Sequence, residues 1–457
     1  MQSRSIWVDI TELFGQFRVA SHPTGVSRTV LKLADALAAE PGNIFCAARP
    51  LFYHPILRQP LTAENSLLSP LAAFFPQLRK LYAQAGLAST SYSSRAMKGI
   101  ATSLPRSLRY RLFPADDGVT LFARWARKQR IRLLPASFND GDCLFVPGSF
   151  WLGKYAGHLL AQARLARTPV TAFVHDTLLL SHPEWLPGRH SSQFRRGCEA
   201  FLPFCAAIVC NSQHTQQELR RLVALPDSLP IETCRLADRF EDIVPHVPTA
   251  LSEIQAKRYV LCVSTPIPRK NHALLIEAWR CLEQRDPSTP YLLLVGGGAP
   301  DPLRTGSNSK KAHGGRVVWL GGVDDHCLAA LYRGAWMTAY PSLGEGYGLP
   351  VAEALGHGKV CLAAPSGGIP EISADLIDFI DPLDPESVIA KVRAYLAEPN
   401  RLGAREDEIR RRYVSTSWSD TARTVRSILE KTCARVDPLR SNRSLTARAD
   451  TTQLLES

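Results

Sequence analysis

The second half of the chain alternates short apolar runs with segments of helical periodicity, and this alternation constrains the fold more than any other feature. The apolar runs are four to six residues long and bounded by turn-forming residues, as is typical of buried parallel strands. The expected strands are 259–264, 291–295, 317–320, 337–340 and 360–363, and the expected helices are 271–282, 325–333, 350–357 and 385–398. Such alternation predicts a doubly wound α/β domain.

The first half shows the same pattern less regularly. Its expected elements are strands at 5–10, 143–146, 170–174 and 207–210 and a helix at 27–38. A chain of 457 residues is long for one hydrophobic core, which favours two domains. We therefore expect a first α/β domain at 1–242, a Pro-rich linker at 243–256, a second α/β domain at 257–434 and a disordered tail at 435–457.

Composition argues against several classes of protein. No run of eighteen apolar residues suggests a transmembrane helix, and the first residues lack the apolar core of a secretory signal. The eleven cysteines are scattered at spacings that fit no common zinc pattern, so we expect buried free thiols in a reducing compartment. Together these features predict a cytoplasmic protein.

The net charge of +12 is unevenly distributed, with a basic insert at about 78–135. Between residues 95 and 132, ten Lys and Arg residues accompany only two Asp, and aromatic and aliphatic residues lie between them. Three interpretations stay open: a surface for anionic lipid at the inner face of the cell membrane, a nucleic-acid interface, and a solvated basic face. Because nothing resembles a nucleic-acid module, we expect no nucleic-acid partner.

The segment 340–371 carries the densest cluster of chemical groups. Glu345 and Glu353 are separated by seven residues, glycines surround the first, and Pro350 precedes the second. A glycine-rich turn that enters a helix presents backbone N–H groups, which suit an anionic ligand. Carboxylates next to an anion would repel it, so they make sense as groups that hold hydroxyls. A ligand with central phosphates and hydroxyls at both ends is a nucleotide sugar.

Two cations follow the first expected strand of the second half. Arg269 and Lys270 lie in the segment STPIPRKN, at a turn between a strand and a helix. Arg can hold two phosphate oxygens at once, while Lys adds a mobile point charge. Neutralising the charge that grows on a leaving diphosphate is the largest rate effect open to such a site. A surface cation pair is the alternative interpretation.

These segments resemble those of a known enzyme family. PSLGEGYGLPVAE resembles PS-x-x-EGFGLP-x-x-E, the E-x7-E signature of retaining family-4 glycosyltransferases (glycosyl transferases group 1), with Tyr347 in place of Phe. STPIPRKN resembles the family's diphosphate-binding segment. HPTGVSRTV resembles TGI-x-R-V, FVHDTLLLSHPEW resembles HD-x-x-x-x-x-HPE, and CNSQHTQQEL resembles NS-x-x-T. The resemblance implies the GT-B fold, in which two Rossmann-like domains face a central cleft. It implies that the first domain, 1–242, binds the acceptor and that the second, 257–434, binds the nucleotide-sugar donor.

Carried over to matching positions, the resemblance implies catalytic roles for Glu345, His175, Arg269 and Lys270. Glu345 would hold hydroxyls of the donor sugar. His175 would lie near that sugar or its α-phosphate.

Further positions are implied in donor binding. Glu353 would hold the ribose hydroxyls, and Gly25 would let backbone N–H groups approach a phosphate. The remaining donor-binding positions are Gly346, Tyr347, Gly348 and Leu349 around the glycine-rich turn, and Val323 near the base. The pair Gly367–Gly368 departs from the small polar pair usual in the family, so the resemblance assigns no role to this edge of the site.

The expected chemistry needs no metal and no cofactor. Asp324 and Asp325 are adjacent rather than spaced as a metal-binding pair, and we expect them to cap a helix. Arg269 and Lys270 can supply the positive charge that a metal supplies elsewhere. Family membership implies retention of anomeric configuration. The leaving phosphate would take the acceptor proton, and a nucleophilic Glu345 is the alternative.

The sequence thus predicts a retaining, metal-independent glycosyltransferase. It would move a hexose or deoxyhexose, mannose or rhamnose first, from a nucleotide-diphosphate sugar to a glycan or lipid-linked acceptor in the synthesis of cell-surface polysaccharide or lipopolysaccharide. The alternatives are a sugar-nucleotide epimerase or a phosphorylase on the same fold, and a non-catalytic, membrane-associated subunit of glycan assembly. The presence of both cations and both carboxylates argues against a loss of activity.

Overall fold

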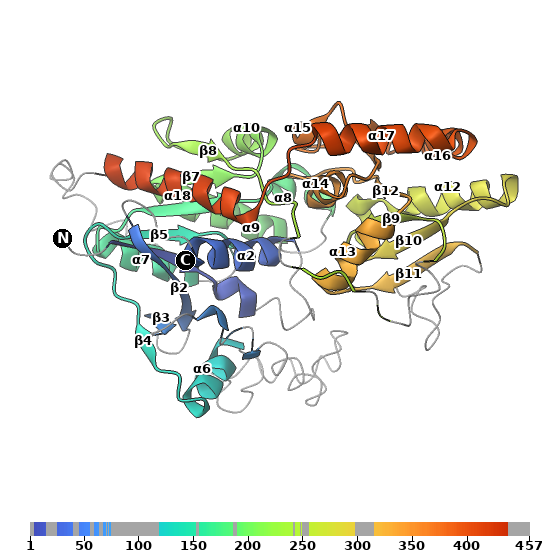
Figure 1. Cartoon of the computed structure of the whole chain (residues 1–457). Helices are drawn as coiled ribbons and strands as arrows, with labels where there is room; N and C mark the ends of the chain where they lie inside the picture. Colours follow the sequence, from blue (N-terminus) through green and yellow to red (C-terminus); the bar gives the residue numbers. More distant parts are fainter. Residues whose placement is uncertain are drawn as a thin grey trace, which may run out of the picture.

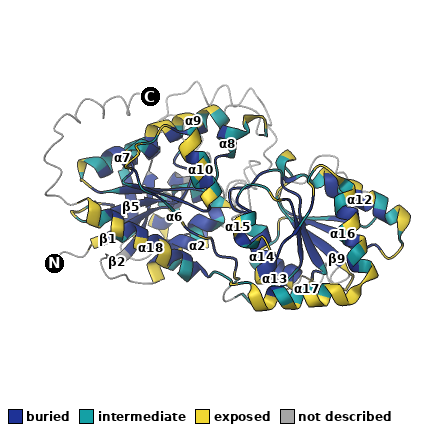
Figure 2. Ribbon diagram, turned by 90° about the horizontal axis from the view of Figure 1, so that it is seen from above, coloured by how far each residue is buried: buried dark blue, intermediate teal, exposed yellow. Residues whose placement is uncertain are grey.

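The computed structural model shows two α/β domains side by side (Figure 1). It describes residues 4–14, 25–39, 45–54, 59–63, 67–69, 71, 73–74, 118–151, 155–185, 190–240, 243–246, 248, 256–297 and 315–436. In each domain a buried sheet lies between layers of helices whose outer faces are exposed (Figure 2). The fold class expected from the sequence is confirmed.

The first domain is built on an eight-stranded sheet in the order β4-β3-β2-β1-β5-β6-β7-β8. Its strands are β1 (Arg4–Asp9), β2 (Phe45–His54), β3 (Gln59–Ala63), β4 (Leu133–Pro135), β5 (Cys143–Val146), β6 (Val170–Val174), β7 (Ala207–Cys210) and β8 (Ile231–Thr233). Its helices include α2 (Val26–Ala39), α6 (Gly118–Lys128), α7 (Tyr155–Leu165), α8 (Leu178–Ser181), α9 (His190–Phe201) and α10 (Gln213–Leu222). The run β2-β1-β5-β6-β7-β8 pairs in parallel, and β3 and β4 add an antiparallel edge next to β2.

The second domain has a six-stranded, wholly parallel sheet in the order β11-β10-β9-β12-β13-β14. Its strands are β9 (Tyr259–Val263), β10 (Tyr291–Val295), β11 (Val317–Gly321), β12 (Met337–Tyr340), β13 (Cys361–Ala363) and β14 (Asp378–Phe379). Its helices are α12 (His272–Arg285), α13 (Asp325–Gly334), α14 (Leu349–Gly356), α15 (Pro370–Ser373), α16 (Pro385–Ala397) and α17 (Pro399–Arg412). This strand order reverses between β9 and β12, where doubly wound sheets bind ligands.

Local sequence explains how these elements begin. The strands β5, β6 and β7 are buried throughout, because helices cover both faces of a parallel sheet. Ser212 caps α10, and its side chain accepts a hydrogen bond from the backbone N–H of Thr215. Asp324 caps α13 through the backbone N–H of Cys327, as expected.

The last helix, α18 (Trp418–Arg435), follows the second domain in sequence but lies on the first (Figure 1). Its buried face packs against α2, and Nη2 of Arg426 donates a hydrogen bond to the carbonyl of Leu37 at 2.7 Å. The boundary expected at residue 434 therefore gives the second domain a helix that packs on the first.

The chain thus crosses between the domains twice, near Asp238 and near Thr416, and hydrogen bonds join the two crossing segments. Oδ2 of Asp238 accepts hydrogen bonds from the hydroxyl of Tyr413 at 2.8 Å and from the backbone N–H of Thr416 at 3.2 Å. The backbone N–H of Asp238 donates to the carbonyl of Thr416 at 3.1 Å.

Several expectations fall wholly or partly outside the described residues. The basic insert is described only from residue 118, where α6 and the edge strand β4 join the first domain and Phe122 is fully buried. Most of the expected linker and the tail from 437 are likewise not described. Each cysteine that the structure describes is a free thiol, and most are buried. No helix in the described ranges is both long and apolar enough to cross a membrane.

Candidate functional site

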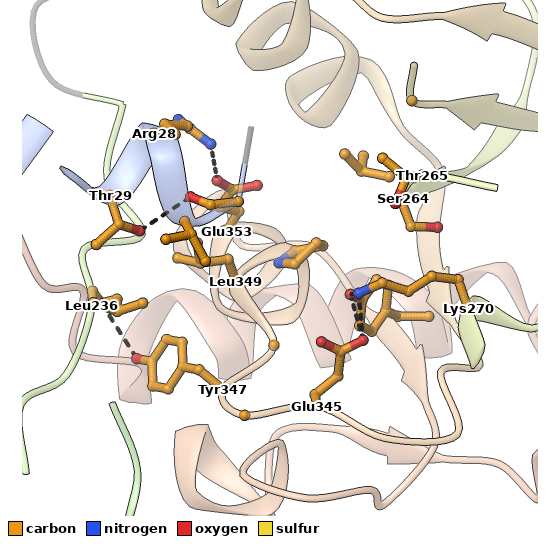
Figure 3. Close-up of a pocket in the computed structure, with 18 of the residues that line it drawn as sticks. Arg28, Thr29, Leu236, Ser264, Thr265, Lys270, Glu345, Tyr347, Leu349 and Glu353 are labelled. Carbon is orange, nitrogen blue, oxygen red and sulfur yellow. Dashed lines mark hydrogen bonds and ion pairs between the residues drawn. The ribbon is translucent and has the colours of Figure 1, made fainter. Parts of the chain in front are cut away.

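A cavity of about 290 Å³ lies between the domains, at the reversal of strand order in the second sheet (Figure 3). The first domain contributes the start of α2 and the loop after β6. The second domain contributes the loops after β9, β11 and β12 and the helix α14. Every site residue expected from the sequence lines this cavity: Gly25, His175, Arg269, Lys270, Val323, Glu345, Gly346, Tyr347, Gly348, Leu349 and Glu353.

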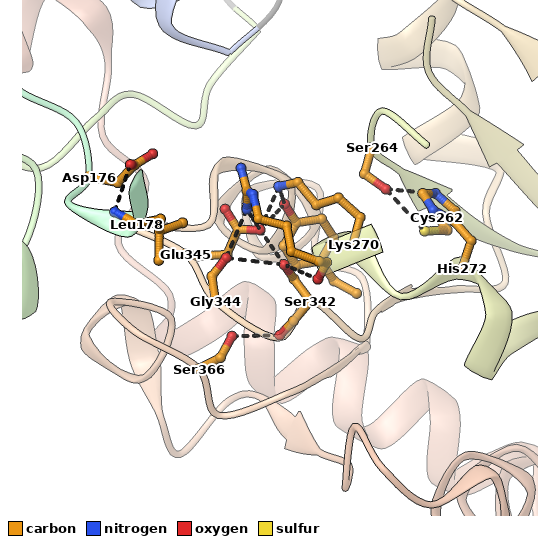
Figure 4. A network of polar contacts seen from close by, with 12 residues as sticks. Asp176, Leu178, Cys262, Ser264, Lys270, His272, Ser342, Gly344, Glu345 and Ser366 are labelled. Carbon is orange, nitrogen blue, oxygen red and sulfur yellow. Dashed lines mark hydrogen bonds and ion pairs between the residues drawn. The ribbon is translucent and has the colours of Figure 1, made fainter. Parts of the chain in front are cut away.

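Glu345 lies at the centre of a dense polar network (Figure 4). Its Oε1 atom accepts hydrogen bonds from Nζ of Lys270 at 2.5 Å and from Nη1 of Arg269 at 2.9 Å. The same oxygen accepts from the hydroxyl of Tyr340 at 3.0 Å and from that of Ser342 at 2.5 Å. Oε2 has no hydrogen-bond partner among the residues that the structure describes. It can therefore accept a hydrogen bond from a ligand.

The cations determine the charge of this network. Burial alone would raise the pKa of Glu345, but the charges of Lys270 and Arg269 lower it to about 2. Burial lowers the pKa of Lys270, although Glu345 acts in the opposite direction. The Glu345 carboxylate is therefore ionised throughout the neutral range and pairs with two cations, Lys270 and Arg269.

Glycines allow the Glu345 loop to pack closely against its neighbours. A Cβ atom at Gly346 would lie 2.0 Å from the carbonyl oxygen of His175. Gly367 has a φ of +58°, and a Cβ atom there would lie 1.8 Å from the carbonyl oxygen of Glu345. A Cβ atom at Gly368 would lie 2.2 Å from the carbonyl oxygen of Gly346. The Gly367–Gly368 pair thus supports the loop where a larger pair would collide with it.

Glu353 lies in α14 and accepts hydrogen bonds from residues of both domains (Figure 3). Its Oε1 accepts a hydrogen bond from Nη1 of Arg28 in α2 at 2.5 Å, and its Oε2 accepts from the hydroxyl of Tyr332 at 2.9 Å. Burial raises the pKa of Glu353, and Arg28 only partly offsets this effect. Arg28 also lies 3.5 Å from Asp325 and over the ring of Phe240. A ribose at Glu353 would have to share or displace these partners.

His175 connects the cavity to the body of the first domain. Its Nε2 atom lies 2.7 Å from the carbonyl of Pro147. Because a carbonyl only accepts, Nε2 carries the hydrogen and Nδ1 is left as the acceptor of the neutral ring. Burial lowers the pKa of His175, which keeps that ring neutral. The side-chain amide of Asn211 donates to the backbone carbonyl of His175 at 2.6 Å.

Polar contacts join the two domains around the Glu345 loop. The hydroxyl of Ser212 donates to the carbonyl of Gly346 at 2.6 Å. The hydroxyl of Tyr347 lies 3.4 Å from the carbonyl of Leu236, a contact that the usual Phe could not make. Glu371 accepts from the first two backbone N–H groups of α10, each at 2.7 Å. The structure is therefore closed around the cavity.

Sequence reasoning missed several groups of the site. Tyr340 and Ser342 lie within the quoted glycine-rich segment, yet neither was assigned as a partner of Glu345. Tyr332 lies on α13 and carries no motif, so no local signal could have indicated it. Arg28 stood within a recognised segment, but its partner is 325 residues away and only the fold shows the pairing.

The cavity also has a small and polar end beyond the expected residues. Ser264 and Thr265 follow β9, and Gly296 and Gly297 follow β10. With Val323 they line the side where the base of a nucleotide is expected. Within the described ranges, no three His, Cys, Asp or Glu side chains are grouped so that they could hold a metal ion.

Comparisons with known proteins agree with this geometry. Residues 257–398 match the family model described as glycosyl transferases group 1. The chain is 29% identical over 246 residues to O-antigen chain mannosyltransferase B of Escherichia coli, and the alignment covers 52% of this chain and 62% of that protein. It is 34% identical over 119 residues to MMP alpha-(1->4)-mannosyltransferase of Mycolicibacterium hassiacum, covering 25% of this chain and 29% of that protein. It thus spans less than two thirds of the length of either relative.

Solved structures share the whole architecture at low sequence identity. Sucrose-phosphate synthase from Thermosynechococcus elongatus superposes with a TM-score of 0.56 at 16% identity, covering 95% of this chain and 100% of that one. A glycosyltransferase from Rickettsia africae gives a TM-score of 0.51 at 13% identity, covering 94% and 99%. The family expected from the sequence is confirmed for the second domain. This domain belongs to the glycosyl transferases group 1, in a chain with the GT-B fold of two Rossmann-like domains that face a central cleft.

Proposed function

We propose that the protein is a retaining glycosyltransferase that takes a hexose or deoxyhexose from a nucleotide-diphosphate sugar. The acceptor would be a glycan or a lipid-linked glycan in cell-surface polysaccharide synthesis. One observation carries this proposal: Arg269, Lys270 and Glu345 converge in one cavity between the domains, at the point where a doubly wound sheet binds its ligand. The cations suit the diphosphate, and the free Oε2 of Glu345 suits a sugar hydroxyl.

Mannose is our first choice for the transferred sugar, with rhamnose second. The support for mannose is that two relatives are an O-antigen chain mannosyltransferase and an MMP alpha-(1->4)-mannosyltransferase.

The expected reaction breaks one bond and forms one on the same face of the sugar. The bond between C1 and the phosphate oxygen breaks, and the acceptor oxygen bonds to C1. The acceptor proton passes to the leaving phosphate, whose negative charge Arg269 and Lys270 stabilise. A nucleophilic Glu345 is disfavoured, because the charges of Lys270 and Arg269 lower the pKa of its carboxyl to about 2, which marks a weak base.

We propose that this chemistry needs neither a metal nor an organic cofactor. Two cations already reach the place expected for the diphosphate, so the charge that a metal would supply is present in side chains. The expected result is that EDTA leaves the transfer rate unchanged. A loss of activity that Mg²⁺ restores would show that this part of the proposal is wrong.

A thermal-shift experiment tests the donor site directly. GDP, UDP and dTDP, and their sugars, are added to the full chain, and the unfolding temperature is recorded. A nucleotide at about 100 times its Kd adds about 2.7 kcal/mol of stability, which corresponds to a shift of several degrees. If no nucleotide stabilises the protein, the donor-site proposal fails. Conversion of the nucleotide sugar without an acceptor would instead favour an epimerase.

We also propose that a basic surface on α6 and the turn just after it contacts anionic membrane lipid at the inner face of the membrane. Arg124, Arg127 and Arg130 are exposed, while Phe122 and Ala126 anchor the helix in the domain. The triple change Arg124→Glu, Arg127→Glu and Arg130→Glu is expected to abolish flotation with anionic liposomes at low salt. Unchanged flotation would show that this face is only solvated.

A further inference from the structure

Glu12 lies just beyond β1, in a helical turn at 11–14. The order of the first sheet reverses at β1, between β2 and β5, so the carboxyl end of this strand borders the cleft between the domains. Asp9 ends the strand, and its Oδ1 accepts hydrogen bonds from the backbone N–H and the hydroxyl of Thr11 at 3.0 and 2.5 Å. Glu12 is therefore held next to the cleft, although it does not itself line the cavity.

The two carboxylate oxygens of Glu12 bind two different segments of the first domain. Oε1 accepts a hydrogen bond from the hydroxyl of Ser27, in the first turn of α2, at 2.8 Å. Oε2 accepts from the backbone N–H of Ser149, in the loop after β5, at 2.5 Å. A Cβ atom at Gly148 would lie 2.5 Å from Oε2, so this glycine lets the loop backbone approach the carboxylate. One side chain thus joins α2 to the loop after β5.

The first of these segments brings Arg28 to the cavity. Ser27 is buried, and the next residue, Arg28, lines the cavity and donates a hydrogen bond to Glu353 of the second domain at 2.5 Å. Gly25, two residues before Ser27, lines the same cavity. The bond between Glu12 and Ser27 therefore fixes the helical turn whose neighbouring residues reach the site.

The second segment holds the ring of His175. The carbonyl of Pro147 accepts a hydrogen bond from Nε2 of this ring at 2.7 Å. Pro147 and Ser149 belong to the same short loop, so the bond from Ser149 to Glu12 also fixes the carbonyl that orients His175. Burial lowers the pKa of His175 and the charge of Glu12 acts in the opposite direction, as is typical of a carboxylate close to the ring.

We propose that Glu12 is a positioning residue that sets Arg28 and His175 relative to each other on the first-domain side of the cavity. The inference rests on the function proposed above and adds a residue that lies outside its motifs. Arg28 belongs to α2 and His175 follows β6, so no short stretch of chain fixes their spacing. The carboxylate of Glu12 supports both of them at once. Such preorganisation lowers the cost of ordering the site when the donor binds.

The test uses the full chain and two independent measurements. Titration calorimetry gives the Kd of the nucleotide sugar that stabilises the protein most in the thermal-shift panel, GDP-mannose by expectation. Nitrogen-15 NMR of labelled histidine gives the tautomer of His175, and His175→Asn assigns its signals. The unmodified protein is expected to show the form with hydrogen on Nε2, because the carbonyl of Pro147 accepts from it.

Glu12→Ala removes both hydrogen bonds and is expected to change both measurements. The donor Kd is expected to rise about tenfold, the size of effect that one or two lost hydrogen bonds produce. The His175 signals are expected to show a mixture of the two tautomers, because the loop that carries the Pro147 carbonyl is no longer held. Ser27→Ala breaks only the bond to α2, so it is expected to raise the donor Kd and leave the tautomer unchanged. This second variant decides the question if Glu12→Ala does not fold.

Two further variants separate positioning from general damage. Glu12→Gln can keep both contacts, since its amide oxygen accepts and its amide N–H donates, and it is expected to restore the donor Kd and the tautomer. Thr11→Val removes a neighbouring hydroxyl that bonds Asp9 and the backbone N–H of Tyr53. It is expected to lower the unfolding temperature and to change neither measurement.

Three results would overturn the proposal. One is that Glu12→Ala and Ser27→Ala leave the donor Kd and the His175 tautomer unchanged. Another is that Thr11→Val produces the same losses, which would show general damage. The third is that Glu12→Gln is as defective as Glu12→Ala, which would make charge and not placement the cause. If the tautomer changes as expected while no nucleotide binds, the donor proposal fails and the positioning of His175 by Glu12 stands.

Discussion

The two carboxylates of the cavity proposed for the donor differ in where their partners come from. Glu345 receives its four hydrogen bonds from its own domain, and its pKa is lowered to about 2. Glu353 receives one of its two hydrogen bonds from Arg28 of the other domain, and burial raises its pKa. One end of the cavity is thus assembled within a single domain. The other end is complete only while the domains are closed.

The largest effect is expected when Glu345, whose hydrogen-bond partners all come from its own domain, is replaced. Glu345→Ala leaves the buried Lys270 and the partly buried Arg269 next to each other without their counter-charge, which costs about 3–5 kcal/mol of unfolding free energy. Loss of a charge-stabilising group at the reacting centre is expected to lower kcat by about 100-fold or more. Urea unfolding and sugar transfer measure the two effects.

A matched control shows that the position of Glu345 matters, and not the loss of a carboxylate alone. Glu386 pairs with Arg285 on the surface, so Glu386→Ala is expected to cost at most about 1 kcal/mol. Normal transfer by Glu345→Ala would contradict the role assigned to this residue.

A smaller effect is expected when the contact between Arg28 of the first domain and Glu353 of the second is removed. Arg28→Ala leaves Glu353 without its cross-domain partner and weakens the closed state. We expect the donor KM to rise about tenfold, equivalent to about 1.4 kcal/mol, and the radius of gyration in solution to increase. X-ray scattering and steady-state kinetics measure these quantities. Lys32→Ala, which removes a half-exposed cation 3.9 Å from Asp325, is the control. If Arg28→Ala changes neither quantity, closure does not depend on this pair.

The pH dependence of stability is expected to have opposite signs for the two carboxylates. Glu345 has a lowered pKa, so its stabilising contribution is present above its ordinary value of 4.5 and is lost as the pH falls toward about 2. Glu353 has a raised pKa, so its ionisation destabilises the fold as the pH rises above 4.5.

Unfolding of the unmodified protein, Glu345→Gln and Glu353→Gln across this range measures both contributions. The advantage of the unmodified protein over Glu345→Gln is expected to shrink as the pH falls below 4.5. Its advantage over Glu353→Gln is expected to shrink as the pH rises above that value. The same sign for both variants would show that the two ends are electrostatically alike.

The second domain was more predictable from sequence than the first, for a physical reason. Its strands are short apolar runs buried on both faces, and the expected ranges 291–295 and 337–340 coincide with β10 and β12. In the first domain, β2, β3 and β4 were missed, since two of them form an antiparallel edge that breaks the βαβ alternation. The charged helix α17 was also missed, because few of its residues face the core.

The site divides in the same way. Residues within a contiguous motif, such as Glu345 and its glycines, could be placed in the cavity from the sequence. The partners that set their charge state could not. Arg28 meets Glu353, and Trp185 meets Gly344, only because two separate sheets face each other. Contacts of this kind are set by domain docking, for which a single sequence carries no periodic signal.

The hydrogen-bonded pair of passages at Asp238 and Thr416 restricts how the cleft can open. One covalent connection would let the lobes swivel in any direction, whereas two connections bonded side by side form a hinge with a single axis. Opening is then a rotation of one domain about this hinge. The rotation separates Arg28 from Glu353 and, at the same time, Glu371 from the start of α10. Product release and substrate entry would follow one reproducible path, with its pivot at a buried aspartate.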